Sequence, residues 1–247
     1  MTNRTFETSP QTLARIAGVL YLIIIVGGIF AEVFVRERML VYRDPAATAN
    51  NILAHEMLFR LGFASGVIML MCALPVLFIL YHLLNRVNKS FAILAVFFNL
   101  SSIAIEGVNL LHHYEPLILL KGVGHLSSFS PDQLQALAYT TLRLQSTGYD
   151  LSLAFFGFFC IFIGYLIFKS TFFPRLLGVL MVVAGLCYLI NSFVNFLAPQ
   201  YSLFPYIGIP PFVAELSLCL WLIVKAVNVR KWEERASAWR VSGTQLF

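Results

Sequence analysis

Charged residues are scarce in this chain. Asp, Glu, Lys and Arg make up only 12% of its 247 residues, whereas hydrophobic residues make up 59%. A soluble domain carries about 25% charged residues, because charged side chains are what cover a surface that faces water. The composition therefore excludes a soluble globular protein and predicts one whose surface faces lipid.

Cysteine is also sparse, and its spacing excludes the common metal and redox motifs. The four cysteines lie inside apolar runs and form no Cys-x-x-Cys pair, so we interpret them as small packing residues. No two histidines stand in a His-x-x-x-His pair, and no strand is predicted that could precede a phosphate-binding loop. The sequence predicts neither a bound metal nor a cofactor.

The formal net charge of +5 raises the question of a nucleic-acid partner. The basic residues, however, stand at the ends of apolar runs rather than along one stripe, which is the distribution found in membrane proteins. We therefore expect the lipid bilayer as the partner and no nucleic acid. Nothing in the sequence indicates an oligomeric state.

Long apolar runs are what the chain has in abundance. A run of about 20 apolar residues crosses a bilayer as a helix, and the sequence predicts six such spans. They cover about residues 13–35, 57–84, 91–113, 149–168, 175–197 and 209–227. Residues 1–12 form a polar N-terminal segment and residues 228–247 a basic tail. The predicted fold is all-α, a polytopic membrane protein with a six-transmembrane-helix bundle.

Proline and capping signals refine the ends of these helices. Pro75 lies inside the second run, where a membrane bundle tolerates the kink that proline causes. Pro116 is expected to stop the third helix. In the following loop, Ser130-Pro131-Asp132-Gln133 predicts a capping box and a helix start. The apolar spacing after it predicts a short amphipathic helix between spans three and four, which ends near Gly148.

The positions of Lys and Arg orient the spans. With the N-terminus in the cytoplasm, eleven of the 17 Lys and Arg residues fall in cytoplasmic segments and six in the longer outer segments. The positive-inside rule then places both termini in the cytoplasm. Trp232 and Trp239, among the basic residues of the tail, are typical of an interfacial anchor to anionic lipid.

A stripe of polar side chains runs along the third span. Spacings of three and four residues separate its members, which are Asn99, Ser102, Glu106, Asn109 and His113. Such spacings place them on one helical face, which must be turned to protein or water rather than to lipid. Because a charge at the centre of a span costs about 2.5–3.5 kcal/mol, Glu106 is the most informative member. A rise of about 1.5 Å per residue places it in the outer third of the membrane.

Polar groups are expected at a similar depth on the other spans. They are Glu32, Arg60, Asp150, Asn191, Asn195 and Glu215. Their shared depth predicts one polar cavity that opens outward, with Glu106 and Asn109 as the central contacts and Arg60 as the counter-charge to Glu106 or Glu32. The other candidate ligand-binding residues are Asn195, Glu215, His113 and Asp150.

Two other interpretations of these polar groups stay open. The first is that they serve only as interhelical hydrogen bonds, each worth about 0.6 kcal/mol. The second is a metal site for lipid hydrolysis built from His113, Asp150 and Glu215. Glu106 and His113 are two helical turns apart, which is too far for both to ligate one ion.

Five segments of the chain resemble one bacterial membrane family. They are RIAGVLYL at 15–22, LFRLGF at 58–63, GVNLL at 107–111, FPRLLGVL at 173–180 and AELSLCLWL at 214–222. Over about residues 12–230 the chain resembles the uncharacterised family known as domain of unknown function 4386. The resemblance implies a six-helix protein of the bacterial inner membrane. It implies no activity, so it transfers no catalytic residue.

The sequence as a whole favours a binding function over an enzymatic one. We expect an integral protein of the cytoplasmic membrane that binds or transports a small molecule or a lipid headgroup in an outward-facing polar cavity. The alternatives are an intramembrane metal-assisted hydrolase and a structural or partner-binding membrane subunit.

Overall fold

The computed structural model describes residues 9–121, 124–201, 203 and 205–243. Within these ranges the chain is helical and contains no strand. Six helical segments are long and apolar enough to cross a membrane. They are Pro10–Met39, Glu56–Leu84, Lys89–Lys121, Pro131–Lys169, Arg175–Leu197 and Tyr206–Val224. The predicted all-α bundle with six spans is confirmed.

The first span is built from three consecutive segments. They are the helix α1 (Pro10–Ile29), the π-helical segment η1 (Phe30–Arg36) and the short helix α2 (Glu37–Met39). The remaining elements, in chain order, are α3 (Pro45–Ala54), α4 (Glu56–Leu84), α5 (Lys89–Lys121), η2 (Gly124–Ser128), α6 (Pro131–Lys169), α7 (Arg175–Leu197), η3 (Tyr206–Gly208), α8 (Ile209–Val224) and α9 (Val229–Gly243).

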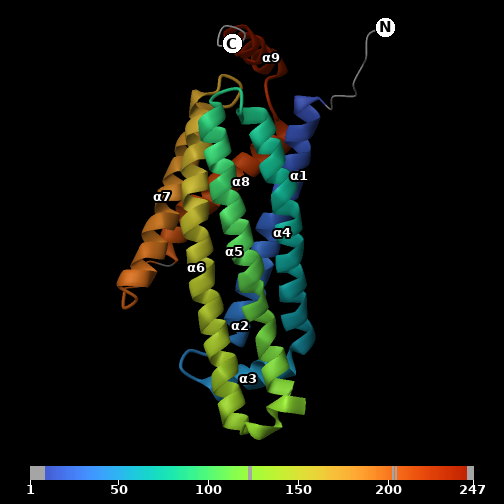
Figure 1. Cartoon of the computed structure of the whole chain (residues 1–247), viewed down its shortest axis with the longest axis vertical. Coiled ribbons are helices and arrows are strands. Elements are labelled where there is room, and N and C mark those ends of the chain that lie inside the picture. Colours follow the sequence, from blue (N-terminus) through green and yellow to red (C-terminus); the bar gives the residue numbers. More distant parts are fainter. Residues whose placement is uncertain (1–8, 122–123, 202, 204, 244–247) are drawn as a thin grey trace.

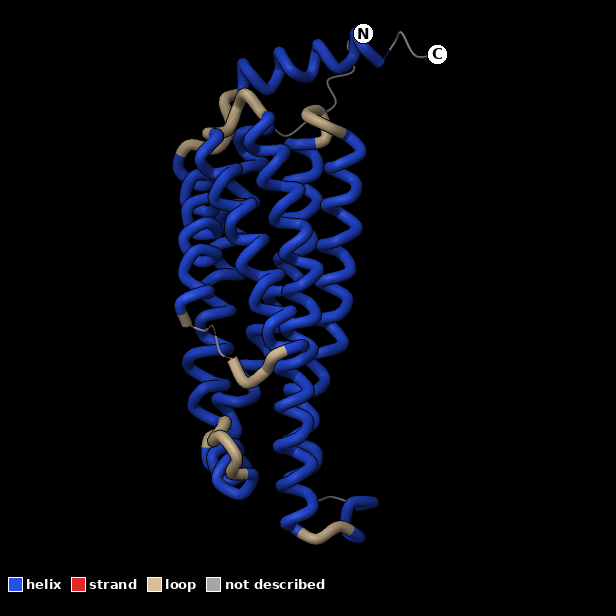
Figure 2. Tube along the Cα trace, turned by 90° about the vertical axis from the view of Figure 1, so that its left-hand side faces the viewer, coloured by secondary structure: helices blue, strands red, loops and turns tan. Residues whose placement is uncertain are grey.

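The bundle has two ends that differ in structure (Figure 1). At one end, here called the terminal end, α1 begins and α9 lies across the ends of the other helices, as Figure 2 also shows. At the opposite end, here called the distal end, α2 and α3 lie beside the turn from α5 to α6. The helices α5 and α6 extend farther toward the distal end than α7 does (Figure 1).

The predicted amphipathic helix of residues 131–148 is not a separate element. It forms the first half of α6, which continues without interruption for 39 residues. The predicted capping box at Ser130 and Gln133 is confirmed. The predicted end of the helix depended on Gly148 alone. A glycine inside a helix costs only about 1 kcal/mol of stability, and the long contact between α6 and α5 offsets this cost. The resulting helix is roughly 58 Å long, about twice the thickness of the hydrocarbon layer.

The prediction that Pro116 stops the third helix is also wrong, because α5 runs through this proline to Lys121. A proline inside a helix removes one backbone hydrogen bond and costs roughly 3 kcal/mol. Packing stabilises the last turn despite this loss. Pro116 is buried, and Leu117 belongs to a small distal core.

Two apolar cores lie on either side of the polar stripe of α5. The larger core occupies the terminal half of the bundle, where Ala95 of α5 and Phe159 of α6 are among its members. The smaller core lies at the distal end and consists of Val35, Met39, Ile52, Phe59, Leu117 and Leu142. The polar stripe of α5 stands between the two cores, since Ala92 and Ala95 before it belong to the larger core and Leu117 after it belongs to the smaller one.

Glycines allow α6 and α7 to approach backbone to backbone. A Cβ atom built on Gly178 would lie 2.6 Å from the carbonyl oxygen of Gly164, and one on Gly157 would lie 2.9 Å from that of Gly185. Neither distance leaves room for a side chain. These contacts agree with the small residues that membrane helices use at close crossings.

Candidate functional site

The polar stripe of α5 faces protein, as its spacing predicts. Asn99, Ser102, Asn109 and His113 are all buried. Ser102 pairs with Ser152 of α6, and their hydroxyl oxygens are 2.9 Å apart. Each of these two hydroxyls also lies within 3.1 Å of the other residue's carbonyl oxygen. This reciprocal pair joins α5 to α6 on the side of the polar stripe that faces the larger core.

Asn109 connects the stripe to α6 one layer farther toward the distal end. Its Nδ2 donates to Glu106 Oε2 at 3.1 Å and to the carbonyl oxygen of Gln145 at 3.0 Å. Both partners are acceptors, so they fix the orientation of the amide and leave Oδ1 as the remaining acceptor. Within the described part of the chain, Asn109 Oδ1 and Gln145 Oε1 are buried without a hydrogen-bond partner.

The π-helical segment η1 brings a charged pair beside this amide. Arg36 Nη1 donates to Glu32 Oε2 at 2.7 Å, and Arg36 Nη2 donates to Ser146 Oγ of α6. Both Glu32 and Arg36 are close enough to Glu106 to interact with it electrostatically. A π-helical turn inside an α-helix is rare and often lies at a functional site. The distal polar cluster is defined here as Glu32, Arg36, Glu106, Asn109, Gln145 and Ser146.

The predicted counter-charge role of Arg60 is corrected by the structure. Arg60 donates to Glu56 one turn earlier in α4 and to the hydroxyl of Tyr114, each at 2.8 Å. Lys121 Nζ lies 2.7 Å from the same Glu56 carboxylate. Arg36, not Arg60, is therefore the guanidinium beside Glu106 and Glu32. Arg60 pairs with Glu56 because side chains four residues apart on one helix are neighbours on its surface.

His113 lies between the distal polar cluster and the small distal core. Its Nε2 is 3.0 Å from the carbonyl oxygen of Phe59, and its ring stacks on the Phe59 ring with centroids 4.3 Å apart. His113 is only 6% exposed. The side chain therefore holds α5 against α4 rather than facing Glu106.

The predicted site residues Asp150 and Asn195 are hydrogen-bonded to each other. Asn195 Nδ2 of α7 donates to Asp150 Oδ2 of α6 at 3.0 Å. Asp150 also interacts electrostatically with Arg36 and Glu32. The pair thus stands at the α7 side of the distal polar cluster and adds a third carboxylate to its surroundings.

Glu215 lies apart from this cluster. Its two carboxylate oxygens accept hydrogen bonds from Tyr21 of α1, at 3.0 Å, and from Tyr188 of α7. Counting about 1.5 Å per residue from Val224 places Glu215 roughly 14 Å from the terminal end of α8, near the middle of a hydrocarbon layer about 30 Å thick. The same count along α5 places Glu106 roughly 26 Å from Lys89.

The family model described as domain of unknown function (DUF4386) matches residues 16–226, which include the distal polar cluster and Glu215. The chain belongs to this family. An uncharacterized protein of Archaeoglobus fulgidus is 32% identical over 76 residues, which are 31% of this chain and 44% of that relative. The match therefore spans less than half of the relative's length. No solved structure matches the chain.

The three residues of the predicted metal site do not converge in this DUF4386 protein. His113 bonds to Phe59, Asp150 to Asn195, and Glu215 to two tyrosines. Among the described residues, no group of three His, Cys, Asp or Glu side chains is placed to hold one metal ion. The described side chains of the DUF4386 chain thus form separate polar sites instead of one metal centre.

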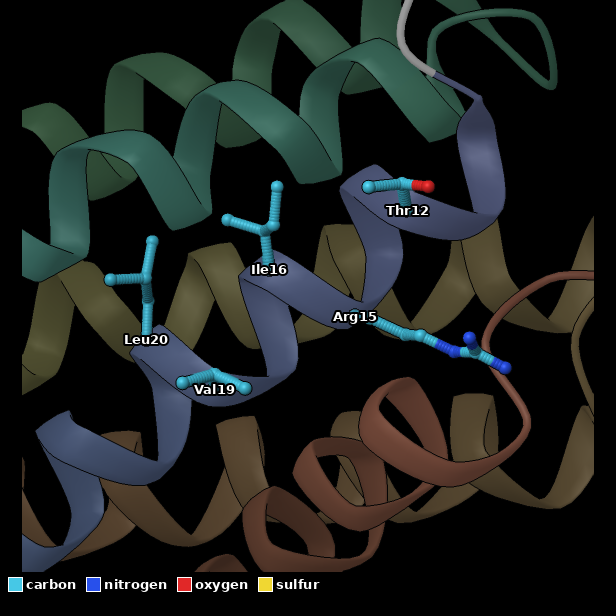
Figure 3. A pocket seen from close by; sticks show the side chains of 5 residues that line it. All are labelled: Thr12, Arg15, Ile16, Val19 and Leu20. Carbon is cyan, nitrogen blue, oxygen red and sulfur yellow. The ribbon is translucent and has the colours of Figure 1, made fainter.

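Two surface pockets of the DUF4386 protein lie on its apolar flank. Figure 3 shows the first, which is lined by Thr12, Arg15, Ile16, Val19 and Leu20 of α1. The second lies between α1 and α4 and is lined by Leu22, Ile23, Val26, Gly27, Phe30, Ser65 and Ile68. Exposed apolar side chains such as Val19 and Val26 suit contact with lipid chains. Neither pocket includes a predicted ligand-binding residue.

Sequence reasoning missed several residues that complete these sites. Gln145 and Ser146 belong to the predicted amphipathic helix, and Arg36 lies just beyond the predicted first span of residues 13–35. Tyr21 and Tyr188 were not distinguished from other aromatic residues of apolar runs. One signal was available, because Arg36 follows Glu32 by four residues, the spacing of a helical ion pair.

Proposed function

We propose that the distal polar cluster binds the protonated amine of a small molecule or of a lipid headgroup. The observation that carries this proposal is the pair of buried amide oxygens, Asn109 Oδ1 and Gln145 Oε1, which lack a hydrogen-bond donor among the described residues. A buried polar atom without a partner costs about 1–3 kcal/mol. Because both atoms are acceptors, the ligand that satisfies them must be a donor.

The charge of the cluster favours a cationic donor. Arg36 is engaged by Glu32 at 2.7 Å, so it does not neutralise a second carboxylate fully. Glu106 accepts a hydrogen bond from the Asn109 amide and forms no ion pair with any described residue. Asp150 adds a further negative charge nearby. An ammonium group supplies both the positive charge and three donors.

The position of the cluster favours entry from the distal side. Glu106, Glu32 and Asp150 are only partly buried, and Glu106 lies at a depth of roughly 26 Å along α5, near the far face of the hydrocarbon layer. The excess of Lys and Arg near the terminal end supports a cytoplasmic location for that end under the positive-inside rule. The site then opens to the outer leaflet of a cytoplasmic membrane.

Binding of a fluorescent long-chain alkylamine to the protein in nanodiscs tests the proposal. Glu106→Gln keeps the size of the side chain but removes its charge, and a hydrogen bond to a charged group contributes about 1.5–3 kcal/mol. We expect the dissociation constant to rise roughly 10- to 150-fold. Glu115→Gln on the same helix is the matched control, because Glu115 lies outside the distal polar cluster and pairs with His112 at 3.4 Å, and it should bind as the wild type does.

Two further measurements distinguish binding through the ammonium charge from binding through the hydrophobic chain. The long-chain alcohol of equal length should bind weakly to all variants, because it lacks the ammonium charge. Arg36→Gln should strengthen binding of the amine, since it removes the competing cation. Equal binding of amine and alcohol by the wild-type protein, or unchanged amine binding by Glu106→Gln, would refute the proposal.

A further inference from the structure

A partly buried carboxylate at mid-depth of the bundle has no role in the proposed amine site. Glu215 of α8 receives the hydroxyls of Tyr21 and Tyr188 on its two oxygens. It forms no ion pair with any residue in the described part of the chain. Three helices, α1, α7 and α8, thus converge on one acidic group inside the membrane-spanning region.

The surroundings of Glu215 supply donors but no compensating charge. Tyr21 of α1 and Tyr188 of α7 donate to it, and the other titratable groups near it among the described residues are Tyr149 and Cys160 of α6. Tyrosine and cysteine are uncharged near neutral pH. An uncompensated charge inside a membrane is costly, and intramembrane carboxylates often serve proton relays. The cation that balances Glu215 must therefore come from solvent.

A proton is the cation that fits this site best. Both carboxylate oxygens are already occupied by hydroxyl donors, and a metal cation such as Ca²⁺ would need several additional oxygen ligands. A proton needs only one lone pair of the carboxylate. The hydroxyls of Tyr21 and Tyr188 can rotate to accept as well as donate, so the site accommodates both the charged and the neutral carboxyl group.

Tyr149 stands beside the distal polar cluster on the inward face of α6. It lies one helical turn after Gln145 and one turn before Ser152, and both of these residues hydrogen-bond to α5. It also directly precedes Asp150, which accepts a hydrogen bond from Asn195 of α7. Ser192, one turn beyond Tyr188 on α7, has a fully buried hydroxyl with no hydrogen-bond partner among the described residues. Polar groups thus continue from the distal cluster toward the centre of the bundle.

We propose that Glu215 is a proton-binding site that exchanges its proton with the distal side by way of Tyr149. In the uptake step, a hydronium ion at the distal polar cluster gives up its proton and becomes water, and the Glu215 carboxylate becomes a neutral carboxylic acid. The release step is the reverse. This inference goes beyond amine binding and does not depend on it, because the distal cluster serves here only as the entrance.

Infrared difference spectroscopy of the protein in nanodiscs tests the proposal. The wild-type protein should show a carboxylic acid C=O band that changes with pH and shifts in D₂O. The band should be absent from Glu215→Gln and displaced in Glu215→Asp, which keeps an acid if the amide variant fails to fold. Tyr149→Phe should keep the band but slow its exchange with D₂O at least tenfold. Tyr165→Phe, elsewhere on α6, is the matched control and should exchange as the wild type does.

Each outcome decides the proposal. A wild-type spectrum with no acid band assignable to Glu215, or a band that changes neither with pH nor in D₂O, overturns the proton-binding site. A Tyr149→Phe variant that exchanges as fast as the control overturns the distal route. Because alkylamine binding is measured separately on Glu106 variants, failure of either proposal leaves the result for the other distinguishable.

Discussion

Replacement of Gly148 by alanine is expected to break the connection between Asn109 and α6. A Cβ atom at this position would lie 2.6 Å from Asn109 Cγ and even closer to Oδ1. The amide would have to leave its place, because the added Cβ is bonded directly to the rigid α6 backbone and cannot move away. Both hydrogen bonds of Asn109, at 3.1 and 3.0 Å, would be lost.

The magnitude follows from those two bonds. The bond to the Glu106 carboxylate contributes about 1.5–3 kcal/mol, and the bond to the Gln145 carbonyl contributes about 1 kcal/mol. The greater helix propensity of alanine offsets about 1 kcal/mol of this loss. We therefore expect Gly148→Ala to lower the free energy of unfolding by about 1.5–3 kcal/mol, measured by reversible denaturation in mixed micelles.

A control variant and a double-mutant cycle test whether the loss of stability comes from displacement of the Asn109 side chain. Gly107→Ala on α5 places its Cβ 3.8 Å from Leu70, an ordinary contact, so it should be neutral or slightly stabilising. Asn109→Ala removes the atoms that Gly148→Ala displaces, so the two losses should not add. Additive effects in the double variant, or a Gly148→Ala variant as stable as Gly107→Ala, would refute the described packing of Asn109.

The remaining predictions concern helix packing at other places. Gly178→Val should abolish the monodisperse peak in size-exclusion chromatography, because its Cβ would lie 2.6 Å from the Gly164 carbonyl oxygen. Gly28→Ala, which meets only the end of a flexible methionine at 3.3 Å, should retain the peak, and a similar profile for both would contradict the close crossing. Trp232→Phe removes the hydrogen bond from Trp232 Nε1 to the Leu83 carbonyl oxygen at 3.2 Å, worth about 1 kcal/mol. It should speed tryptic cleavage in α9 severalfold, and an unchanged rate would show that this bond does not hold α9.

Local signals in the sequence predicted the helices better than they predicted the helix ends. Apolar run length located all six spans because the thickness of the hydrocarbon layer sets the length of a spanning helix. The ends were misplaced where a local stop signal met extensive packing. Pro116 and Gly148 both weaken a helix locally, yet α5 and α6 continue through them because their long mutual contact is a property of the folded bundle.

The partners of the polar residues were the least predictable feature. Depth alone suggested that Glu106, Arg60 and Glu215 share one cavity, but depth does not state which helix faces are turned to one another. In the structure, Arg60 turns to Glu56, Arg36 takes the place beside Glu106, and Glu215 meets tyrosines. A rotation of one helix by part of a turn would give a different set of partners.

The sequence by itself determined that this DUF4386 protein is a multi-pass membrane protein and that its third span turns a polar face toward protein. Scarce charge, apolar run length and helical spacing are local properties that need no knowledge of neighbouring helices. Only the tertiary structure decided that the polar residues divide into a distal polar cluster and a separate Glu215 site. That division depends on helix rotation and on close crossings such as Gly164 against Gly178, which arise only when all the spans pack together.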